Sequence, residues 1–184
     1  MTDRQICPVP PDFSLEGLGD LRMHVVLVHP EIPQNTGNIA RLCAGTDAWL
    51  HLVEPLGYVL EDRYLRRAGL DYWPGVRLSV HESLDALEPM LPRDRTWLFT
   101  KHADALYREA PLTRGAVLVF GCETKGLPDA FSARWAGQRL RLPTTSKVRS
   151  LNLANAVAIG AYESLRQQGW GGEAPMPSGP PVTP

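Results

Sequence analysis

The run Ala-Val-Leu-Val-Phe at residues 116–120, followed by Gly-Cys-Glu-Thr-Lys-Gly at residues 121–126, decides the fold of this chain. Its first part is entirely apolar, so the strand that it predicts must be buried on both faces. Strands of this kind lie inside parallel sheets that carry helices on both sides. The glycines that follow mark a turn at the carboxyl end of the strand, which is where open α/β sheets place their ligands.

Strands and helices are predicted to alternate on either side of this run. Further strands are predicted from short apolar runs at residues 23–28, 49–53, 76–80, 96–99 and 140–142. Helices are predicted over residues 38–45 and 152–168 from apolar residues at helical spacing. Shorter helices are predicted over the charged segment 61–68, over 84–91 before Pro92, and over 128–135, which has a proline in its first turn. This alternation predicts an α/β fold, with a mostly parallel sheet and helices on both faces.

The two ends of the chain differ in composition from its middle. Residues 1–22 are rich in Pro, Gly and Asp without sustained periodicity, and residues 169–184 hold many glycines and prolines. We expect both segments to be disordered, because neither can bury enough apolar surface to form a core. The 184 residues therefore predict one domain over residues 23–168.

Composition and charge exclude several classes of protein. No apolar run reaches the roughly 18 residues that a membrane-spanning helix needs. The segment before residue 23 is acidic and interrupted by prolines, so it is not a signal peptide, and we expect a cytoplasmic protein. The three cysteines are far apart without a CxxC pair, which argues against a disulfide framework and a metal site. Cys43 falls in an apolar helical pattern and is predicted to be a buried thiol.

The net charge of −1 excludes a generally basic surface but not a local basic patch. Two short clusters are present, one of Arg63, Arg66 and Arg67 and one of Lys147 and Arg149. Runs this short are more often ordinary solvated surface, so charge alone does not identify a nucleic-acid site.

The loop after the first predicted strand carries amides and a guanidinium but no GxGxxG, which disfavours a classical dinucleotide site. In Asn35-Thr-Gly-Asn-Ile-Ala-Arg41, either Asn35 or Thr36 can cap the helix that follows. A helix start with Arg41 one turn along suits an anionic RNA backbone. A capped helix with one surface arginine explains the same residues equally well.

Two further loops follow the later strands. Gly121 allows the backbone to approach a ligand closely, and Glu123 stands between the two glycines of that loop. In the segment from residue 140 to residue 157, Ser150 is a natural helix N-cap. Asn152 and Asn155 early in an apolar helix are harder to explain by stability, because asparagine is a poor helix-interior residue.

Taken together, these three segments resemble the SPOUT superfamily of methyltransferases. Within it, residues 30–43 and 65–72 are similar to the small single-domain, TrmL-like branch of tRNA (cytidine/uridine) 2′-O-methyltransferases. The resemblance covers residue 23 to about residue 170 and implies a C-terminal trefoil knot. It also implies a homodimer with the site at the subunit interface, formed by the first helix after Asn35 and the last helix.

The resemblance implies S-adenosylmethionine as the cofactor, together with the residues that bind it and act on the substrate. The implied cofactor contacts are Phe99, Thr100, Gly121, Leu142, Ser150, Leu151 and Asn155. Arg41 is the implied catalytic residue, supported by Asn35 and Glu123. Because a guanidinium keeps its proton up to a pKa above about 12, we expect Arg41 to orient the substrate rather than act as a base.

The expected activity is methylation of the ribose 2′-hydroxyl of the wobble nucleotide in the anticodon loop of tRNA. We expect phosphates to be contacted by the basic side chains Arg63, Arg66, Arg67, Lys147 and Arg149, and the target base to be presented by a single-stranded loop. Two alternatives stay open: the same chemistry on another RNA, such as ribosomal RNA, and a non-catalytic, cofactor-binding dimer that binds RNA.

Overall fold

The computed structural model describes residues 7–8, 22–60 and 75–170. Within them, one sheet runs in the order β1-β4-β3-β2-β7-β5-β8-β6, and all neighbouring strands are parallel. The strands are β1 (Cys7–Pro8), β2 (Met23–Val28), β3 (Ala48–Val53), β4 (Arg77–His81), β5 (Thr96–Phe99), β6 (Ala105–Leu106), β7 (Ala116–Phe120) and β8 (Arg139–Arg141). The predicted parallel sheet is confirmed.

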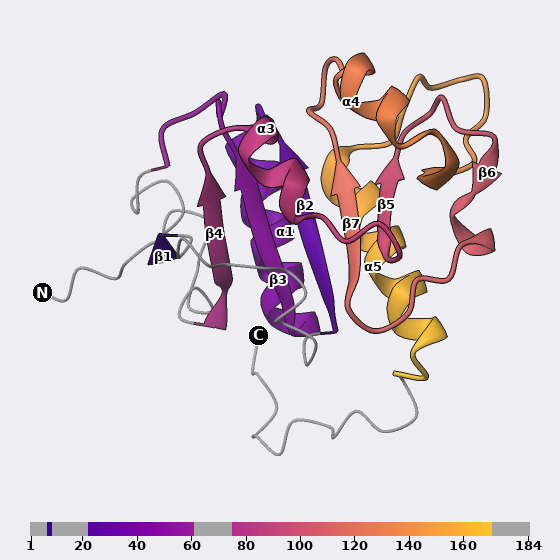
Figure 1. The fold of residues 1–184 in the computed structure, drawn as a ribbon, viewed down its shortest axis with the longest axis horizontal. Coiled ribbons are helices and arrows are strands. Elements are labelled where there is room, and N and C mark those ends of the chain that lie inside the picture. The colour runs from indigo at the N-terminus through magenta and orange to yellow at the C-terminus, as the bar shows by residue number, and fades with distance from the viewer. Residues whose placement is uncertain (1–6, 9–21, 61–74, 171–184) are drawn as a thin grey trace, which may run out of the picture.

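Helices cover both faces of the sheet (Figure 1). The helices are α1 (Pro33–Thr46), α3 (Leu84–Leu87), α4 (Asp129–Arg134) and α5 (Leu153–Gln167), with 3-10 turns η3 (Glu88–Met90), η4 (Tyr107–Glu109) and η5 (Ala136–Gln138). Side chains of α1 and α5 pack into one apolar core, and side chains of α3 and α4 pack into the other. The prediction of helices on both faces is therefore confirmed.

Strand β7 lies between β2 and β5 and separates the two cores. Leu118 faces the core of α1 and α5, whereas Val117 and Val119 face the core of α3 and α4. All five residues of β7 are buried. Its apolar run therefore predicted correctly that this strand is central.

Helix α1 begins earlier than predicted, and neither of the two expected caps is used. Ile32 is the N-cap residue and makes no side-chain capping bond, and Pro33 at the first helical position sets the helical φ. Asn35 and Thr36 are therefore buried within the first turn. They were predicted as caps because the helix was predicted to begin at Asn38, whereas it begins at Pro33.

Helix α5 is capped by Asn152, not by Ser150 as predicted. The Asn152 side chain accepts hydrogen bonds from the backbone N–H groups of Ala154 and Asn155. An asparagine at this position satisfies two of the backbone donors that every helix start leaves unpaired. The helix predicted over residues 84–91 is also shorter, because it changes to 3-10 geometry at Glu88.

Some predictions concern parts of the chain that the structure describes only partly. The helix predicted over 61–68 lies outside the described residues. Cys7–Pro8, inside the segment expected to be disordered, pairs in parallel with β4. The remainder of that segment, and residues 171–184, lie outside the described residues. No helix in the described ranges is long and apolar enough to cross a membrane.

The thiol of Cys43 is fully buried between α1 and the sheet, as predicted. Burial raises the pKa of this thiol to about 12, so it stays protonated and inert. Across the described residues, no group of three or more His, Cys, Asp or Glu side chains could hold a metal ion.

Candidate active site

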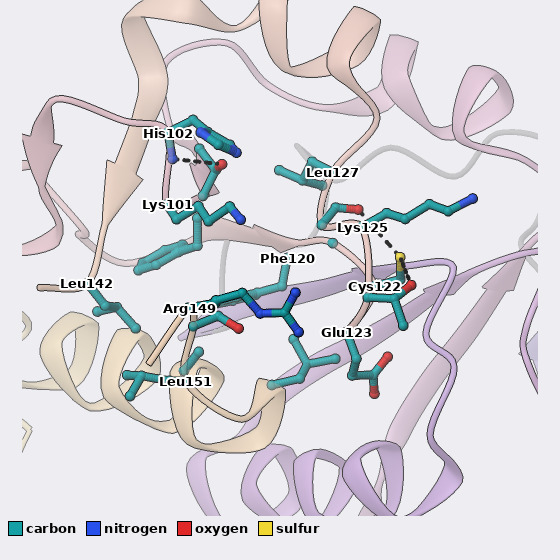
Figure 2. Close-up of a pocket in the computed structure, with 18 of the residues that line it drawn as sticks. Lys101, His102, Phe120, Cys122, Glu123, Lys125, Leu127, Leu142, Arg149 and Leu151 are labelled. Atoms are coloured by element: carbon teal, nitrogen blue, oxygen red, sulfur yellow. Dashed lines mark hydrogen bonds between the residues drawn. The ribbon is translucent and has the colours of Figure 1, made fainter. Parts of the chain in front are cut away.

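A cavity of about 640 Å³ lies at the carboxyl ends of β5, β7 and β8, where the sequence placed the ligand-binding loops (Figure 2). Its size falls in the range of small-molecule binding sites. Its wall is formed by the segments that follow these three strands, by the start of α5 and by part of α4.

Segments far apart in the sequence bring the expected cofactor-binding residues together at this cavity. Of the expected residues, those that line the cavity are Phe99, Thr100, Gly121, Leu142, Ser150 and Leu151. Asn155 does not line it, because it lies on the exposed side of α5. The expected contact of Asn155 with the cofactor is therefore not supported by its position.

The floor of the cavity is a pair of stacked aromatic rings. Phe99 at the end of β5 and Phe120 at the end of β7 have ring centroids 4.5 Å apart. Helix α5 approaches this pair closely because it has a glycine at the contact. A β-carbon at Gly160 would lie 2.9 Å from Cζ of Phe99. Gly160 thus lets α5 pack directly beneath the cavity floor.

The loop after β7 folds back tightly on itself at the cavity. A β-carbon at Gly121 would lie 2.0 Å from the carbonyl carbon of Gly126 and 2.1 Å from the backbone nitrogen of Leu127. An isolated antiparallel β-bridge, a backbone contact, joins Cys122 to Gly126 and closes the loop. Gly126 has a left-handed φ of +76°. Glycine is required at both positions by the path of the loop itself.

Glu123 joins this loop to the start of α1. Its carboxylate accepts hydrogen bonds from the backbone N–H of Glu31 at 2.8 Å and of Ile32 at 3.3 Å. It also accepts a hydrogen bond from Nδ2 of Asn35 at 2.8 Å. In turn, Oδ1 of Asn35 accepts a bond from Nδ2 of Asn152 at 2.9 Å. A continuous set of hydrogen bonds therefore links the loop after β7, the start of α1 and the start of α5.

A reciprocal contact strengthens the same junction. The Glu31 carboxylate accepts bonds from the backbone N–H of Thr124 at 3.1 Å and from its hydroxyl at 2.7 Å. These bonds lower the pKa of Glu31. At the next residue of α1, the hydroxyl of Tyr58 donates to Thr36 at 2.7 Å, and burial raises the pKa of Tyr58 to about 12. The start of α1 is thus held by two separate segments, the loop after β7 and the loop after β3.

The structure brings Asn35 and Glu123 together but leaves Arg41 elsewhere. Both Asn35 and Glu123 line the cavity, whereas Arg41 does not. Arg41 follows Asn35 by six positions, which places the two side chains about 120° apart around a helix of about 3.6 residues per turn. Arg41 is exposed on α1. The arginine and the cavity of one chain therefore do not form one site.

The expected RNA-binding residues are placed differently from one another. Arg149 lines the cavity, and Lys147 is exposed in the same segment before α5. Arg63, Arg66 and Arg67 lie outside the described residues.

Among the polar residues of the cavity wall that sequence reasoning missed are Lys101 and His102, which lie just after β5. The rule that ligands bind at the carboxyl ends of strands applied to them as well. It was not used because no glycine marks this turn. The role of Asn152 was also missed, although its unusual position was noticed.

The comparisons with known proteins agree with this geometry. A model of the SpoU rRNA Methylase family matches residues 22–162. The chain is 47% identical over 154 residues to a tRNA (cytidine(34)-2′-O)-methyltransferase of Burkholderia pseudomallei, covering 82% of this chain and 99% of that protein. It is 45% identical over 149 residues to a protein of the same name from Methylovorus glucosotrophus, covering 80% of this chain and 97% of that protein.

Solved structures lead to the same family. A structure described as giving insights into the 2-OH methylation of C/U34 on tRNA matches with a TM-score of 0.74 and 47% identity. The match covers 79% of this chain and 95% of that one. The parallel sheet, the cavity at its carboxyl edge and these matches together show that the chain belongs to the SpoU rRNA methylase family.

Proposed function

We propose that this chain is an S-adenosylmethionine-dependent methyltransferase that modifies the ribose 2′-hydroxyl of the wobble nucleotide, cytidine or modified uridine, in tRNA. The observation that carries the proposal is the cavity at the ends of β5, β7 and β8, with the Asn35–Glu123 pair on its wall. The names and identities of the relatives support the choice of nucleotide.

The residues of the cavity fit the cofactor. Its apolar floor of Phe99 and Phe120, with Leu142 and Leu151 on the wall, suits the adenine ring. Gly121 and Ser150 bring backbone and hydroxyl groups to the same space. When bound, the cofactor supplies an electrophilic methyl group on a positively charged sulfur.

Glu123 and Asn35 act in this proposal by holding the site in shape. The Glu123 oxygens are already occupied by the N–H groups of Glu31 and Ile32 and by Asn35. Glu123 therefore positions the start of α1 against the cavity rather than removing a proton. Correct orientation of two reacting groups can supply about 7–11 kcal/mol of a reaction barrier, so a fixed junction matters for rate.

A catalytic role for Arg41 requires a second copy of the chain. Beside α1, helix α5 exposes Ile159, 37% exposed, and Tyr162, 55% exposed, with Leu151 before its start. Apolar surface of this kind is typical of interfaces between copies. We propose a homodimer through α1 and α5, in which Arg41 of one copy reaches the cavity of the other. There the guanidinium would orient the ribose hydroxyl and stabilise its developing negative charge.

Three further features belong to the proposal. The family resemblance implies a C-terminal trefoil knot. A cytoplasmic location, and contacts of Arg63, Arg66 and Arg67 with tRNA phosphates, are expectations from the sequence. The expected disorder of both chain ends also stays a prediction.

Methylation of total tRNA in vitro tests the proposed function. The purified protein, labelled cofactor and unmodified tRNA should give a product whose methyl group maps to the ribose of nucleotide 34 by mass spectrometry. A tRNA with a 2′-deoxy nucleotide at that position is the control and should accept no methyl group. Methylation of ribosomal RNA instead, or cofactor binding without turnover on any RNA, would contradict the proposal.

A further inference from the structure

The mouth of the cavity carries an excess of positive charge that the whole chain does not have. Four cationic side chains line the cavity, and they are Lys101, Lys125, Arg139 and Arg149. They face only two carboxylates, Glu123 and Asp129. The Glu123 carboxylate is already directed at the start of α1. Since the net charge of the chain is −1, this local excess is a property of the site.

Two of these cations lie in the same space although they come from distant segments. Lys101 follows β5, and Arg149 belongs to the segment between β8 and α5. Figure 2 shows both side chains extending over the cavity floor near Phe120, whereas Lys125 points toward the outer side. Two independent parts of the fold therefore deliver a positive charge to one place.

Neither of these two side chains is neutralised by the protein. Within the described ranges, Lys101 and Arg149 have no hydrogen-bond or ion-pair partner for their charged groups, and both residues are exposed. Arg77, by contrast, pairs with Asp47 at 2.7 Å. Because Lys101 and Arg149 line one cavity from separate segments and keep their charges available there, an anionic ligand can bind to both.

We propose that Lys101 and Arg149 form a phosphate clamp that holds the RNA backbone beside the target nucleotide. A guanidinium can bind a phosphate through two parallel hydrogen bonds, and an ammonium adds a point charge without a directional requirement. A guanidinium and an ammonium from separate loops can therefore hold neighbouring phosphates of a single strand. The inference rests on the proposed function and adds Lys101 to the RNA-binding residues.

The clamp also explains how a chain of negative net charge binds RNA next to a small-molecule cavity. Each phosphate contact releases counterions, so contacts can be counted from the salt dependence of binding. For single strands the logarithm of the affinity falls with the logarithm of salt concentration by about 0.7 per contact. A clamp of two contacts therefore has a measurable signature that does not depend on turnover.

Binding of an anticodon stem-loop RNA over a range of salt concentrations tests the clamp. The RNA carries a 2′-deoxy nucleotide at position 34, so that no methyl transfer occurs, and binding is followed by fluorescence anisotropy. Lys101→Ala and Arg149→Ala should each reduce the salt slope by about 0.7, and the double variant by about 1.4. Arg77→Ala removes the same charge at the far edge of the sheet and should leave the slope unchanged.

A second set of variants separates the loss of charge from the loss of shape. Lys101→Arg and Arg149→Lys keep the charge and should restore the wild-type slope. Titration calorimetry with S-adenosylmethionine alone should show a Kd within about twofold of the wild type for both alanine variants. A change of twofold corresponds to roughly 0.4 kcal/mol.

Three outcomes would overturn the clamp. One is an unchanged salt slope in the double variant. Another is a loss of cofactor binding with an unchanged slope, which would assign these cations to the carboxylate of the cofactor. The third is an equal reduction of the salt slope in Arg77→Ala and in the two cavity variants. This result would show that the slope reflects the total charge of the protein and not contacts at the cavity. If the wild-type protein bound the cofactor but no stem-loop RNA, the proposed function would be wrong, and the clamp that rests on it would be overturned as well.

Discussion

The two halves of the sheet treat polar side chains in opposite ways. In the half formed by β5, β7 and β8, charged groups surround an open cavity. In the half formed by β2, β3 and β4, His24, His51 and His81 are buried side by side, each at most 5% exposed. The difference teaches that a cluster of titratable residues marks a site only where a ligand can reach it.

The three histidines form a hydrogen-bonded chain across adjacent strands. Nδ1 of His24 lies 3.0 Å from Nε2 of His51, and Nδ1 of His51 lies 3.0 Å from Nε2 of His81. Each contact needs one donor and one acceptor nitrogen, so two neighbouring rings cannot both be protonated. Burial lowers the pKa of His24 and of His81 to about 4, and that of His51 falls well below its ordinary value. Burial in this half of the sheet thus keeps the three histidines uncharged near neutral pH.

Acidification should therefore destabilise the protein through the half of the sheet that holds these histidines, and this is the largest effect we expect. The unfolded chain binds protons at these histidines below about pH 6.5, while the folded chain resists protonation down to about pH 4. The free energy of unfolding should fall across that window by roughly 3 kcal/mol for His24 alone. Urea unfolding at several pH values from 7 to 4 measures it.

Two variants sharpen this measurement. His24→Gln removes one titrating ring and should flatten the pH dependence between pH 6.5 and 4. His102→Asn, at an exposed position, should leave the dependence unchanged. A pH dependence that His24→Gln does not alter would mean that the buried chain is not its source.

The open half should respond most strongly to loss of Glu123. In the wild type, both carboxylate oxygens of Glu123 accept hydrogen bonds from the start of α1. In Glu123→Gln, one of these oxygens is replaced by an NH2 group that cannot accept a bond, so the start of α1 is held less firmly. We expect methyl transfer to fall about 100-fold, since a displacement of about 1 Å can cost this much. Steady-state kinetics with labelled cofactor measures the loss.

Glu31→Gln is the matched control for that variant. Glu31 belongs to the same junction but accepts its bonds from Thr124 and does not line the cavity. Its loss of activity should be at least tenfold smaller. Equal losses in both variants would contradict the larger role given to Glu123.

A smaller effect is expected where α5 touches the floor of the cavity. In Gly160→Val the added side chain must displace Phe99, which has an atom within 2.9 Å of the new β-carbon. We expect cofactor affinity to fall about tenfold, which corresponds to about 1.4 kcal/mol. Gly137→Ala is the control, because nothing lies within 4 Å of its β-carbon position. Titration calorimetry compares the two, and equal Kd values would contradict the role given to Gly160.

The sequence predicted the sheet and the cavity better than it predicted the connections between them. The apolar run of β7 determines its own burial, and strand-to-loop boundaries locate the cavity without any knowledge of tertiary contacts. The Asn35–Glu123 bond joins residues 88 positions apart, so no local pattern could reveal it. The cap at Asn152 was missed because Ser150 satisfies the same local rule and only the path of the chain decides between them. The histidine chain was missed because it depends on strand register.

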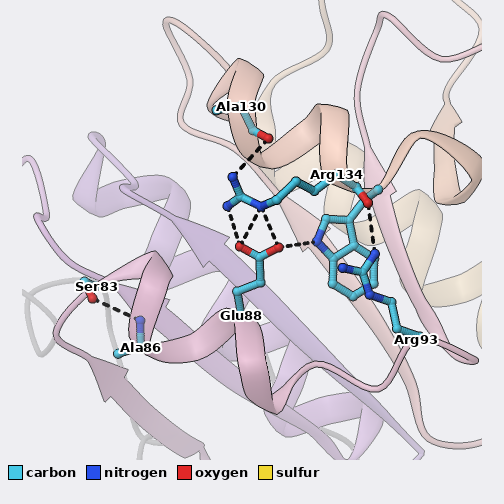
Figure 3. Close-up of polar contacts among 7 residues, drawn as sticks. Ser83, Ala86, Glu88, Arg93, Ala130 and Arg134 are labelled. Atoms are coloured by element: carbon cyan, nitrogen blue, oxygen red, sulfur yellow. Dashed lines mark hydrogen bonds and ion pairs between the residues drawn. The ribbon is translucent and has the colours of Figure 1, made fainter.

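The smallest effect should follow from loss of a charge on the face of the sheet that α3 and α4 cover. Glu88 in η3 accepts bonds from Arg134 and from Nε1 of Trp135, while Arg93 stacks on that indole with its guanidinium carbon 3.8 Å from the centroid of the indole ring (Figure 3). Hydrogen bonds from Arg134 lower the pKa of Glu88. Glu88→Gln keeps an acceptor for Trp135 but removes the ion pair, and Arg134 is half exposed. We therefore expect a loss of at most about 1 kcal/mol in urea unfolding at pH 7.

This last variant also separates stability from function within one measurement. Helix α4 carries Arg134 on one side and contributes Asp129 and Ser132 to the cavity wall on the other. If the ion pair only stabilises the protein, Glu88→Gln should leave the cofactor Kd within about twofold, as Asp47→Asn should at the exposed pair with Arg77. A tenfold weaker Kd in Glu88→Gln alone would show that the ion pair with η3 holds α4 in the position that the cavity needs. A charge outside the cavity would then control what binds within it.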